Sequence, residues 1–591
     1  MSLINDASLI LTPNAVKEGK LYSIIPSNGN GDMTVVRATA TATRTNELGL
    51  IEPTPYNLLG YSEMFSDVSW VKNASSISIN TTTAPNGSLT ADTFTANGVN
   101  TNHLVQGTTS CISGLTYTFS AYVKKDTNNF IQLYAGNPIF GPNVWANFDI
   151  NNGVLGTIGS AATATITSVG NGWYRCTITG IATATLASTA AIFCLITSTT
   201  SVRGEVNTLS TSVYIWGAQL VQGSVPKDYF YTTDRLNVPR LNYDSVGGCP
   251  SILVEPQRTN LLLNSVWAGG GSLPTSWTFA TNTGTTTPVT SIKNPNVTAY
   301  RFVTSNTRQE FNQTFSLILN QVVAFSCYVE SVVIPIPFSF MLRLAGNAGA
   351  TGTVIYLKNN IPVLSNSIIE AGNTYSVVLT CTVAGSFASR IGVGGDGNIT
   401  GDITLSMPQL ELGAATPTPV AAYSTSFIPT TTQTITRNAD IISRSNIYTN
   451  NLITSAGGTF FIELNNNIAF ARDASRYSIG IDTAAGGLTN GFSIKSVVAS
   501  SQRLTIVKII ASVQTNLYTT LNNTVKIAID WNGTTADVFV NGVKVVTGTA
   551  FTTTNMEFLF ATAEDVPKYI KSMMLFPKPL TDAECIALTT L

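Results

Sequence analysis

The single histidine of the chain, His103, is the first residue to consider for chemistry. A Ser–His–Asp or Cys–His device needs a histidine as its base, with a nucleophile close to it in space. His103 follows the polar stretch Val99-Asn100-Thr101-Asn102, and no Gly-x-Ser-x-Gly elbow occurs in the sequence. We therefore predict that His103 lies in a surface loop and has no catalytic role.

Paired carboxylates are the second candidate, because glycoside hydrolysis requires two of them across a cleft, one with a raised pKa. The chain has 32 acidic residues, so some pair is always available, but none stands out. Asp530 precedes a turn, and Glu564-Asp565 lies in a predicted loop. We predict that the protein is not an enzyme and assign no catalytic residue, with glycan cleavage left open as an alternative.

Metal-binding patterns are also incomplete. One histidine and seven scattered cysteines do not assemble the four ligands of a zinc site. The stretch from Gly394 to Asp402 resembles half of a calcium loop, but it lacks the later bidentate glutamate. A Gly/Asn hairpin tip is the favoured interpretation. No metal and no cofactor is predicted.

Sugar binding would use an exposed aromatic ring beside amide and hydroxyl groups. Trp173, Trp216 and Trp531 lie in or beside predicted strands, where a tryptophan more often belongs to the core. The glycan-binding residues therefore stay unknown at this stage.

The composition indicates β-structure with a nearly uncharged surface. Of 591 residues, 44% are hydrophobic and only 11% are charged, and the net charge is −1. Thr favours strands, while Asn and Gly favour turns. Such a surface offers no electrostatic footprint for nucleic acid or anionic lipid. The most apolar stretches, Ile192–Ile196 and Val332–Leu342, are shorter than the roughly 18 residues of a membrane span.

Cysteine usage indicates the compartment of synthesis. Seven cysteines are an odd number, and the N-terminus has no basic segment ahead of an apolar core. We expect reduced, mostly buried thiols in a chain made in a cytoplasm.

An internal repeat determines the domain organisation. The pattern Glu-Pro-x-x-x-Asn-Leu-Leu-x-x-Ser runs from Glu52 to Ser62 and again from Glu255 to Ser265. A second pair of matching strings follows, Phe119–Val123 and Phe325–Val329. Repetition of this kind predicts two successive modules with one topology.

The predicted organisation is an all-β chain of tandem antiparallel sandwiches. Its five parts are an extended N-terminal docking or oligomerisation segment (1–56), sandwich A (57–233), a connector (234–258), sandwich B (259–437) and a C-terminal domain (438–591). The N-terminal segment has too little apolar surface to fold alone, so we expect a partner or another subunit to order it. The Pro-containing joints are predicted to be semi-rigid spacers.

The C-terminal domain carries the clearest local signals. Thr524–Asp530 alternates as a half-buried strand does, and Asn541-Gly542 between two valine-rich strings predicts a tight hairpin. Thr581-Asp582-Ala583-Glu584 is a capping box ahead of a short helix. We expect Ile586 and Leu588 to pack on a sheet, and the domain to fold alone.

Several of these strings resemble known families. Asp530-Trp531-Asn532-Gly533-Thr534 and the close from Leu575 to Glu584 resemble the concanavalin-like, laminin-G-type lectin fold. Asn57-Leu58-Leu59, Trp70, Gly172-Trp173-Tyr174-Arg175 and Gln219-Leu220 resemble jelly-roll domains of the carbohydrate-binding-module type.

The joints resemble linker phrases of tailed-bacteriophage virion proteins. The phrases are Leu253–Leu262, Ser426–Thr430 and Thr436–Asp440, and Ala40–Glu52 is similar to the start of appendage proteins in crAss-like phages. This resemblance implies a head or tail fibre, located in the virion and assembled as a homotrimer. The implied partners are other virion proteins, bound through the N-terminal segment, and host surface glycans, with no nucleic acid and no membrane insertion. A purely structural decoration protein and a glycan depolymerase are the alternatives.

Overall fold

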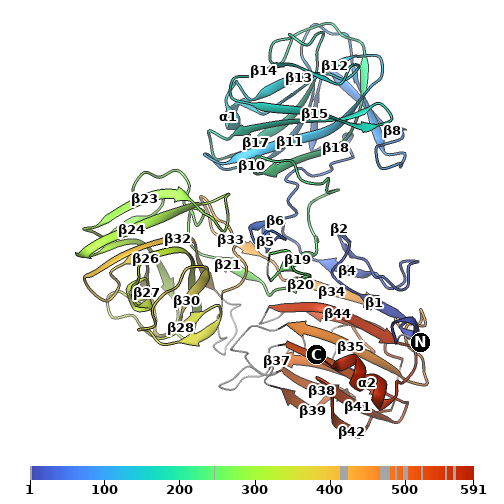
Figure 1. Cartoon of the computed structure of the whole chain (residues 1–591), viewed down its shortest axis with the longest axis vertical. Helices are drawn as coiled ribbons and strands as arrows, with labels where there is room; N and C mark the ends of the chain where they lie inside the picture. Colours follow the sequence, from blue (N-terminus) through green and yellow to red (C-terminus); the bar gives the residue numbers. More distant parts are fainter. Residues whose placement is uncertain are drawn as a thin grey trace. The chain divides into compact units, whose positions relative to one another are not determined.

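A computed structural model of the chain describes residues 3–244, 246–412, 424–465, 479–485, 489–496, 504–520, 524–552, 555–562 and 567–590. Contacts divide the chain into two compact units. The smaller is Pro55–Leu236 with Pro295–Val297, and the larger holds Met1–Thr54, Asn237–Asn294 and Thr298–Leu591. The paired strands are antiparallel, so the predicted all-β class of several sandwiches is confirmed (Figure 1).

The smaller unit is sandwich A. One of its six-stranded sheets has the order β14 (Val154–Ile158), β13 (Trp145–Asp149), β12 (Phe130–Tyr134), β17 (Leu186–Leu195), β10 (His103–Cys111), β7 (Trp70–Asn73). The other has the order β15 (Thr163–Gly170), β16 (Trp173–Ile181), β11 (Thr116–Lys125), β18 (Ser212–Gln222), β9 (Ala91–Ala96), β8 (Ser75–Thr82). One short helix, α1 (Asn137–Phe140), lies between β12 and β13. Alternate residues of most of these strands enclose one apolar core.

Sandwich B, in the larger unit, repeats the strand order of the second of these sheets in full, and that of the first sheet over four strands, without counterparts of β13 and β14. Its larger sheet runs β23 (Thr285–Thr290), β24 (Thr298–Thr307), β32 (Ile399–Leu412), β26 (Val322–Ile334), β30 (Asn373–Val383), β28 (Thr351–Lys358), β29 (Ile361–Val363), and β21 (Arg258–Asn260) joins β32 and β33 (Ile435–Arg437). Its smaller sheet runs β22 (Thr278–Asn282), β25 (Gln309–Leu317), β31 (Gly385–Val393), β27 (Leu342–Gly346). A 3-10 turn, η2 (Phe338–Phe340), precedes β27.

The two sandwiches also share their register. Tyr122 on β11 pairs with Trp216 on β18, after a bulge that follows Ser120. Tyr328 on β26 pairs with Ser406 on β32, after a bulge at the same place. The prediction of one shared topology is therefore confirmed, and Tyr122 and Tyr328 are equivalent positions.

The repeated Asn-Leu-Leu motif has a structural reason. Asn57 accepts hydrogen bonds from the N–H groups of Leu59 and Leu220, and its amide donates to two carbonyls. Asn260 accepts from Leu262 and Leu410 in the same way. A buried polar group must find partners, and here these bonds tie the entry of each sandwich to its last long strand.

Sandwich C completes the larger unit. One sheet runs β19 (Arg240–Tyr243), β20 (Pro250–Val254), β44 (Lys568–Phe576), β35 (Gly458–Asn465), β40 (Thr524–Trp531), β41 (Thr535–Val540), β42 (Val543–Ala550), with β1 (Leu9–Leu11) on β44. The other runs β2 (Val16–Lys17), β3 (Lys20–Leu21), β4 (Met33–Val36), β34 (Ile441–Ser445), β43 (Phe558–Thr562), β36 (Ile479–Asp482), β37 (Gly491–Ser496), β38 (Leu504–Ile510), β39 (Val513–Thr520). The hairpin of β5 (Ala42–Thr45) and β6 (Ile51–Thr54) and the 3-10 turn η1 (Leu3–Asp6) complete the N-terminal part.

This arrangement corrects the predictions for the N-terminal segment and the connector. The described residues of this segment, 3–56, are ordered by their own chain, since Leu9, Leu11 and Met33 are fully buried in the core of sandwich C. The connector 234–258 supplies β19 and β20 to the same sheet. Residues 438–591 therefore lack part of both sheets, and we no longer expect them to fold alone.

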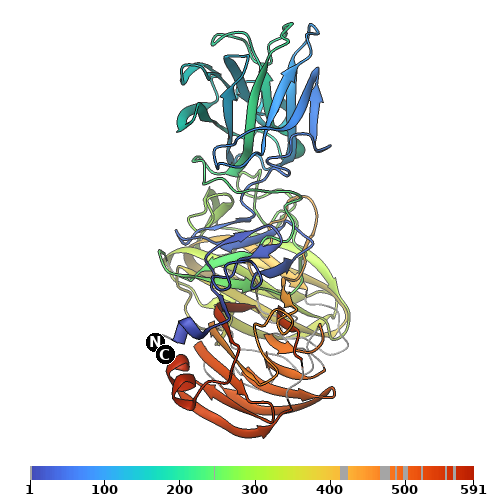
Figure 2. The same ribbon diagram turned by 90° about the vertical axis from the view of Figure 1, so that its right-hand side faces the viewer.

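The local signals of the C-terminal domain are largely confirmed. Asn541 and Gly542 both have positive φ and join β41 to β42. The helix α2 (Asp582–Thr589) begins with the predicted capping box and lies on the outside of sandwich C (Figure 2). Leu588 packs against the sandwich as predicted, whereas Ile586 is exposed and Cys585 takes the buried place.

Candidate functional site

The predicted surface histidine is buried. His103 begins β10, is 0% exposed, and its Nδ1 lies 2.7 Å from the carbonyl oxygen of Ala74. Gln309 occupies the equivalent place at the start of β25 and bonds Asn282 and Gly284. Both side chains contact the turn that follows the neighbouring edge strand. The prediction that His103 lies in a surface loop was therefore wrong, and its observed contact is a structural one.

The predicted acidic candidates do not converge. Burial raises the pKa of Asp530, whose carboxylate accepts hydrogen bonds from Thr459 and the N–H of Leu580. Asp402 lies in β32 and pairs with Arg301, away from the turn that carries Asp396. Glu564-Asp565 lies outside the described residues. Among the residues that the structure describes, no group of three or more potential metal ligands occurs.

The predicted burial of the tryptophans and of most cysteines is confirmed. Trp173, Trp216 and Trp531 are 4% exposed or less. Six of the seven free cysteines are buried, and only Cys249 is exposed. The tryptophans are therefore core residues and not sugar platforms.

A buried cluster of charges stands where spacers were predicted. Arg37 and Arg240 both bind Asp440, and Arg240 and Arg437 both bind Glu255, all within the larger unit. All five side chains are 2% exposed or less. The joints are therefore locked to one another. Removing one member of a buried ion pair typically costs about 3–5 kcal/mol.

The cluster keeps its carboxylates ionised. Burial alone would raise the pKa of Asp440, but Arg240 and Arg37 lower it below its usual range. Arg437 and Arg240 do the same for the pKa of Glu255. Sequence reasoning noticed these Arg, Glu and Asp residues at the joints and missed that they meet in space.

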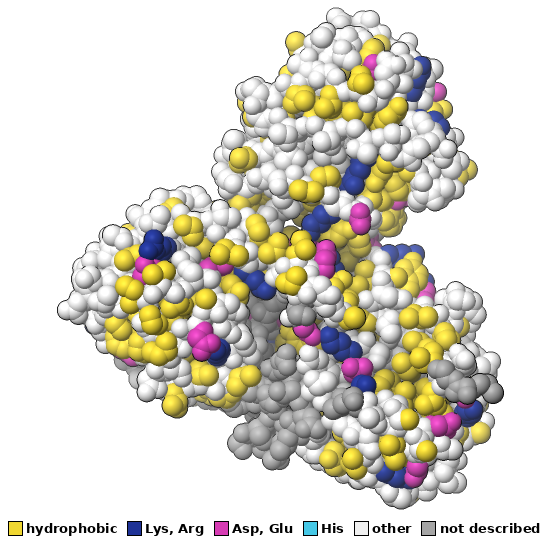
Figure 3. All heavy atoms as spheres, viewed as in Figure 1, with side chains coloured by type: hydrophobic (Ala, Val, Ile, Leu, Met, Phe, Trp, Pro, Cys, Tyr) yellow, Lys and Arg dark blue, Asp and Glu magenta, His cyan; other side chains and the backbone are white. Residues whose placement is uncertain are grey.

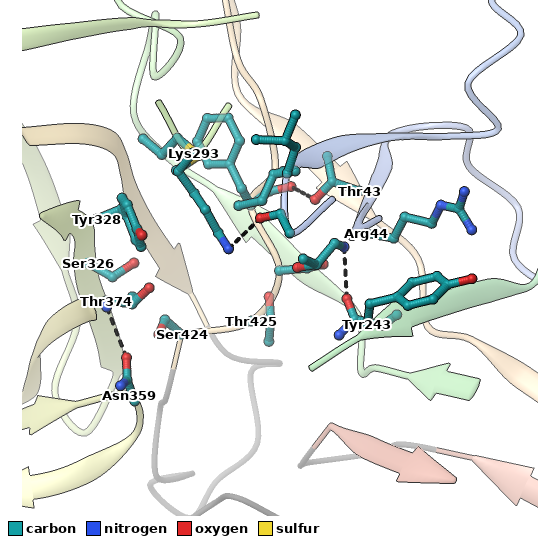
Figure 4. Close-up of a pocket in the computed structure, with 18 of the residues that line it drawn as sticks. Thr43, Arg44, Tyr243, Lys293, Ser326, Tyr328, Asn359, Thr374, Ser424 and Thr425 are labelled. Carbon is teal, nitrogen blue, oxygen red and sulfur yellow. Dashed lines mark hydrogen bonds between the residues drawn. The ribbon is translucent and has the colours of Figure 1, made fainter. Parts of the chain in front are cut away.

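A pocket of about 630 Å³ opens on the outer face of the larger sheet of sandwich B. It lies between that sheet, the β5–β6 hairpin and residues 424–427 (Figure 4). The volume is in the range of small-molecule sites. Figure 4 shows Tyr328, Ser326 and Thr374 on one side and Thr43, Arg44 and Tyr243 on the other.

Several hydroxyl groups of the pocket have no hydrogen-bond partner among the described residues. They include those of Ser326, Tyr328, Thr374 and Tyr243. Tyr328 and Tyr243 are half-buried, so each also presents ring surface. The lining therefore offers unsatisfied donors and acceptors together with aromatic surface.

The charged groups of the pocket, by contrast, are already engaged. Lys293 donates to the carbonyl oxygen of Gly49 at 2.6 Å, and Arg44 pairs with Glu52 at 2.8 Å. Glu330 accepts from two serine hydroxyls and two backbone N–H groups. The free hydrogen-bonding capacity is thus neutral, which suits an uncharged polyhydroxylated ligand.

No protein-family model matches this chain, and comparison with curated proteins gives no match. Among the described residues, no helix has the length and apolar character needed to span a membrane. On the face seen in Figure 3, charged side chains are sparse.

In sandwich A the equivalent face is filled with aromatic rings. Tyr122 packs against Trp216 at 5.2 Å and Tyr229 at 6.1 Å between ring centroids, and Arg175 lies over its ring. Gly217 permits this packing, since a Cβ there would approach the Tyr122 ring to 2.9 Å.

The same positions in sandwich B carry smaller or differently placed groups. Ser406 replaces the tryptophan, Thr374 replaces the arginine, and Met407 replaces the glycine at a positive φ. Ser406 is buried and bonds Glu330, while Tyr328, Thr374 and Met407 line the pocket. The repeat in the sequence could have revealed this substitution once the two strands were aligned.

Proposed function

We propose that this chain is an appendage protein of a tailed-bacteriophage particle and that it adheres to host surface glycans through the pocket of sandwich B. The observation that supports adhesion is the set of free hydroxyls at Ser326, Tyr328, Thr374 and Tyr243. Hydroxyl donors and acceptors beside an aromatic ring match the chemistry of a sugar. The phage assignment rests on the resemblance of the joints.

Adhesion of this kind would be weak at one site and strong through copy number. A homotrimer carrying three pockets would gain affinity in this way. Docking through residues 1–56 stays part of the proposal, but deleting them cannot test it, because the deletion also removes β1 and β4 from sandwich C.

A purely structural role in the particle is the second candidate. The buried ion pairs that lock Arg37, Arg240 and Arg437 to Glu255 and Asp440 favour it, since they stiffen the joints of the larger unit.

A glycan array of the whole chain tests adhesion. We expect wild type to retain neutral glycans and Tyr328→Ala to lose at least about tenfold in affinity, the value of one lost stacking and hydrogen-bonding side chain. Tyr214→Ala, on sandwich A, is the control and should bind as wild type. Absence of any bound glycan would favour the structural role.

Two further measurements complete the test. Release of reducing sugar from a bound glycan would revive the depolymerase alternative. Electron micrographs of particles labelled with an antibody to the chain should place it on the virion, and unlabelled particles would contradict the phage assignment.

A further inference from the structure

A row of polar residues crosses the smaller sheet of sandwich B, on the other sheet from the pocket. Asn312 on β25 pairs in register with Arg390 on β31, and Arg390 pairs with Arg343 on β27. Their neighbours Phe311, Ile391 and Leu342 point into the core, so this row lies on the outer face.

The two arginines stand directly opposite each other without a direct partner. Like charges at opposing strand positions destabilise a sheet. Neither Arg343 nor Arg390 forms a hydrogen bond or ion pair with any described residue, and the Nε of each is buried without a partner. In a chain with only 11% charged residues, such a pair is a marked departure from the rest of the surface.

One buried carboxyl lies near them. Glu310, 2% exposed, has a pKa raised by burial and lowered in part by Arg343, Arg390 and Arg308. The Nε of Arg308 bonds Asn398 at 3.2 Å. Three guanidinium groups thus act on one carboxyl, and the local charge is positive.

The residues that flank the arginine pair are small. Ala345 and Ala388 oppose each other on one side of it, and Gly392 follows Arg390 on the other. Both arginine side chains are half-buried, so part of each stays accessible to a ligand.

We propose that Arg343 and Arg390, assisted by Arg308, form an anion-binding site that takes the carboxylate or sulfate group of an acidic polysaccharide. A guanidinium presents a planar fork of donors that matches an oxyanion. Nucleic acid would need a wider basic surface than three arginines in a chain of net charge −1. The site is separate from the pocket, and the proposal does not depend on the proposed function.

Binding of whole protein to three polymers tests the site: polygalacturonate (carboxylate), dextran sulfate (sulfate) and neutral dextran. We expect one or both anionic polymers, but not dextran, to bind at this site. Comparison of polygalacturonate with dextran sulfate shows whether the site prefers a carboxylate or a sulfate. Arg343→Gln with Arg390→Gln should weaken that binding by at least about tenfold, because hydrogen bonds to charged groups are lost. Arg343→Lys with Arg390→Lys should keep part of it.

Arg301→Gln is the control for arginine loss elsewhere: it removes one positive charge, where the double variant removes two, from the other sheet of sandwich B, where Arg301 pairs with Asp402. It should leave binding unchanged. The double glutamine variant leaves the buried carboxyl of Glu310 without its neighbouring positive charges. If that variant unfolds, adding Glu310→Gln removes this carboxyl, and binding is measured on the triple variant. Equal binding of dextran, no binding of either anionic polymer, or an equal loss in Arg301→Gln would overturn the proposal.

Discussion

Sandwiches A and B share the strand order and register of one sheet, the sheet of Tyr122 in A and of Tyr328 in B, yet the outer faces of these two sheets differ. In A, Trp216 and Tyr229 cover Tyr122 and close the face. In B, Ser406 stands opposite Tyr328 and the face stays open to a pocket. Two sandwiches with one shared framework thus carry an aromatic cluster in one case and an open pocket in the other, with different side chains at three equivalent positions.

The difference between the aromatic cluster of A and the open pocket of B should affect stability. A buried aromatic ring contributes to the stability of its own sandwich, whereas unpaired hydroxyls contribute nothing until a ligand satisfies them. We therefore expect substitutions at equivalent positions to act on stability in A and on binding in B.

The largest effect should come from Trp216→Ala. It removes a ring that is 4% exposed and leaves a cavity, which should cost sandwich A about 3–5 kcal/mol. Ser406→Ala at the equivalent place in B loses one hydrogen bond to Glu330 and should cost about 1.5 kcal/mol. Calorimetry of the whole chain measures the loss of unfolding free energy in both variants. Equal losses would contradict the expected difference between the two faces.

His103→Ala should have the next largest effect. The substitution removes a fully buried side chain and its bond to Ala74, so we expect a loss of about 2 kcal/mol. Gln309→Ala, its counterpart in B, should lose a similar amount. A melting temperature unchanged by both would show that this shared corner does not stabilise either sandwich.

Transfer of the aromatic cover should close the pocket. Ser406→Trp with Met407→Gly gives B the residues of A, and we expect at least about a tenfold loss of affinity for any glycan retained on the array. Thr353→Trp, at an exposed position of β28 outside the pocket lining, is the control. Unchanged affinity in the double variant would place glycan binding elsewhere.

The smallest effect concerns pH. Burial raises the pKa of Glu63, which faces Tyr229 and Trp216 in A, above its ordinary value of 4.5. The folded state therefore holds this proton longer than the unfolded state, so its contribution to stability is lost as pH rises through the folded pKa. Val266 holds the matching place in the repeat of B.

Glu63→Gln should flatten the pH dependence of the sandwich A melting transition between pH 4 and pH 7. Thermal unfolding at several pH values measures it. A slope equal to that of wild type would show that Glu63 does not report on the aromatic cover.

The internal repeat allowed the paired sandwiches to be predicted from the sequence, whereas little of the candidate site could be predicted. Asn57 and Asn260, at matching positions of the repeat, predicted two equivalent sandwiches, and Asn541-Gly542 predicted its hairpin. Each of these predictions depends on a short stretch of sequence. The charge cluster was misjudged as spacers, since Arg37, Arg240 and Asp440 are hundreds of residues apart and their pairing is visible only in space.

The pocket was unpredictable for a related reason. Thr43, Tyr243 and Tyr328 come from three distant parts of the chain, and each reads as an ordinary strand residue by itself. His103 was misjudged because its polar neighbours indicate a loop, although the strand that begins there buries it.

The pairing of β1 with β44 has a consequence for how the protein is made. Ser8 bonds the carbonyl oxygen of Leu575, 567 residues further along. A ribosome working at roughly 5–20 residues per second needs about half a minute to two minutes to cover that distance. β1 therefore waits for β44, and a chain that terminates before β44 lacks the strand that pairs with β1 in sandwich C.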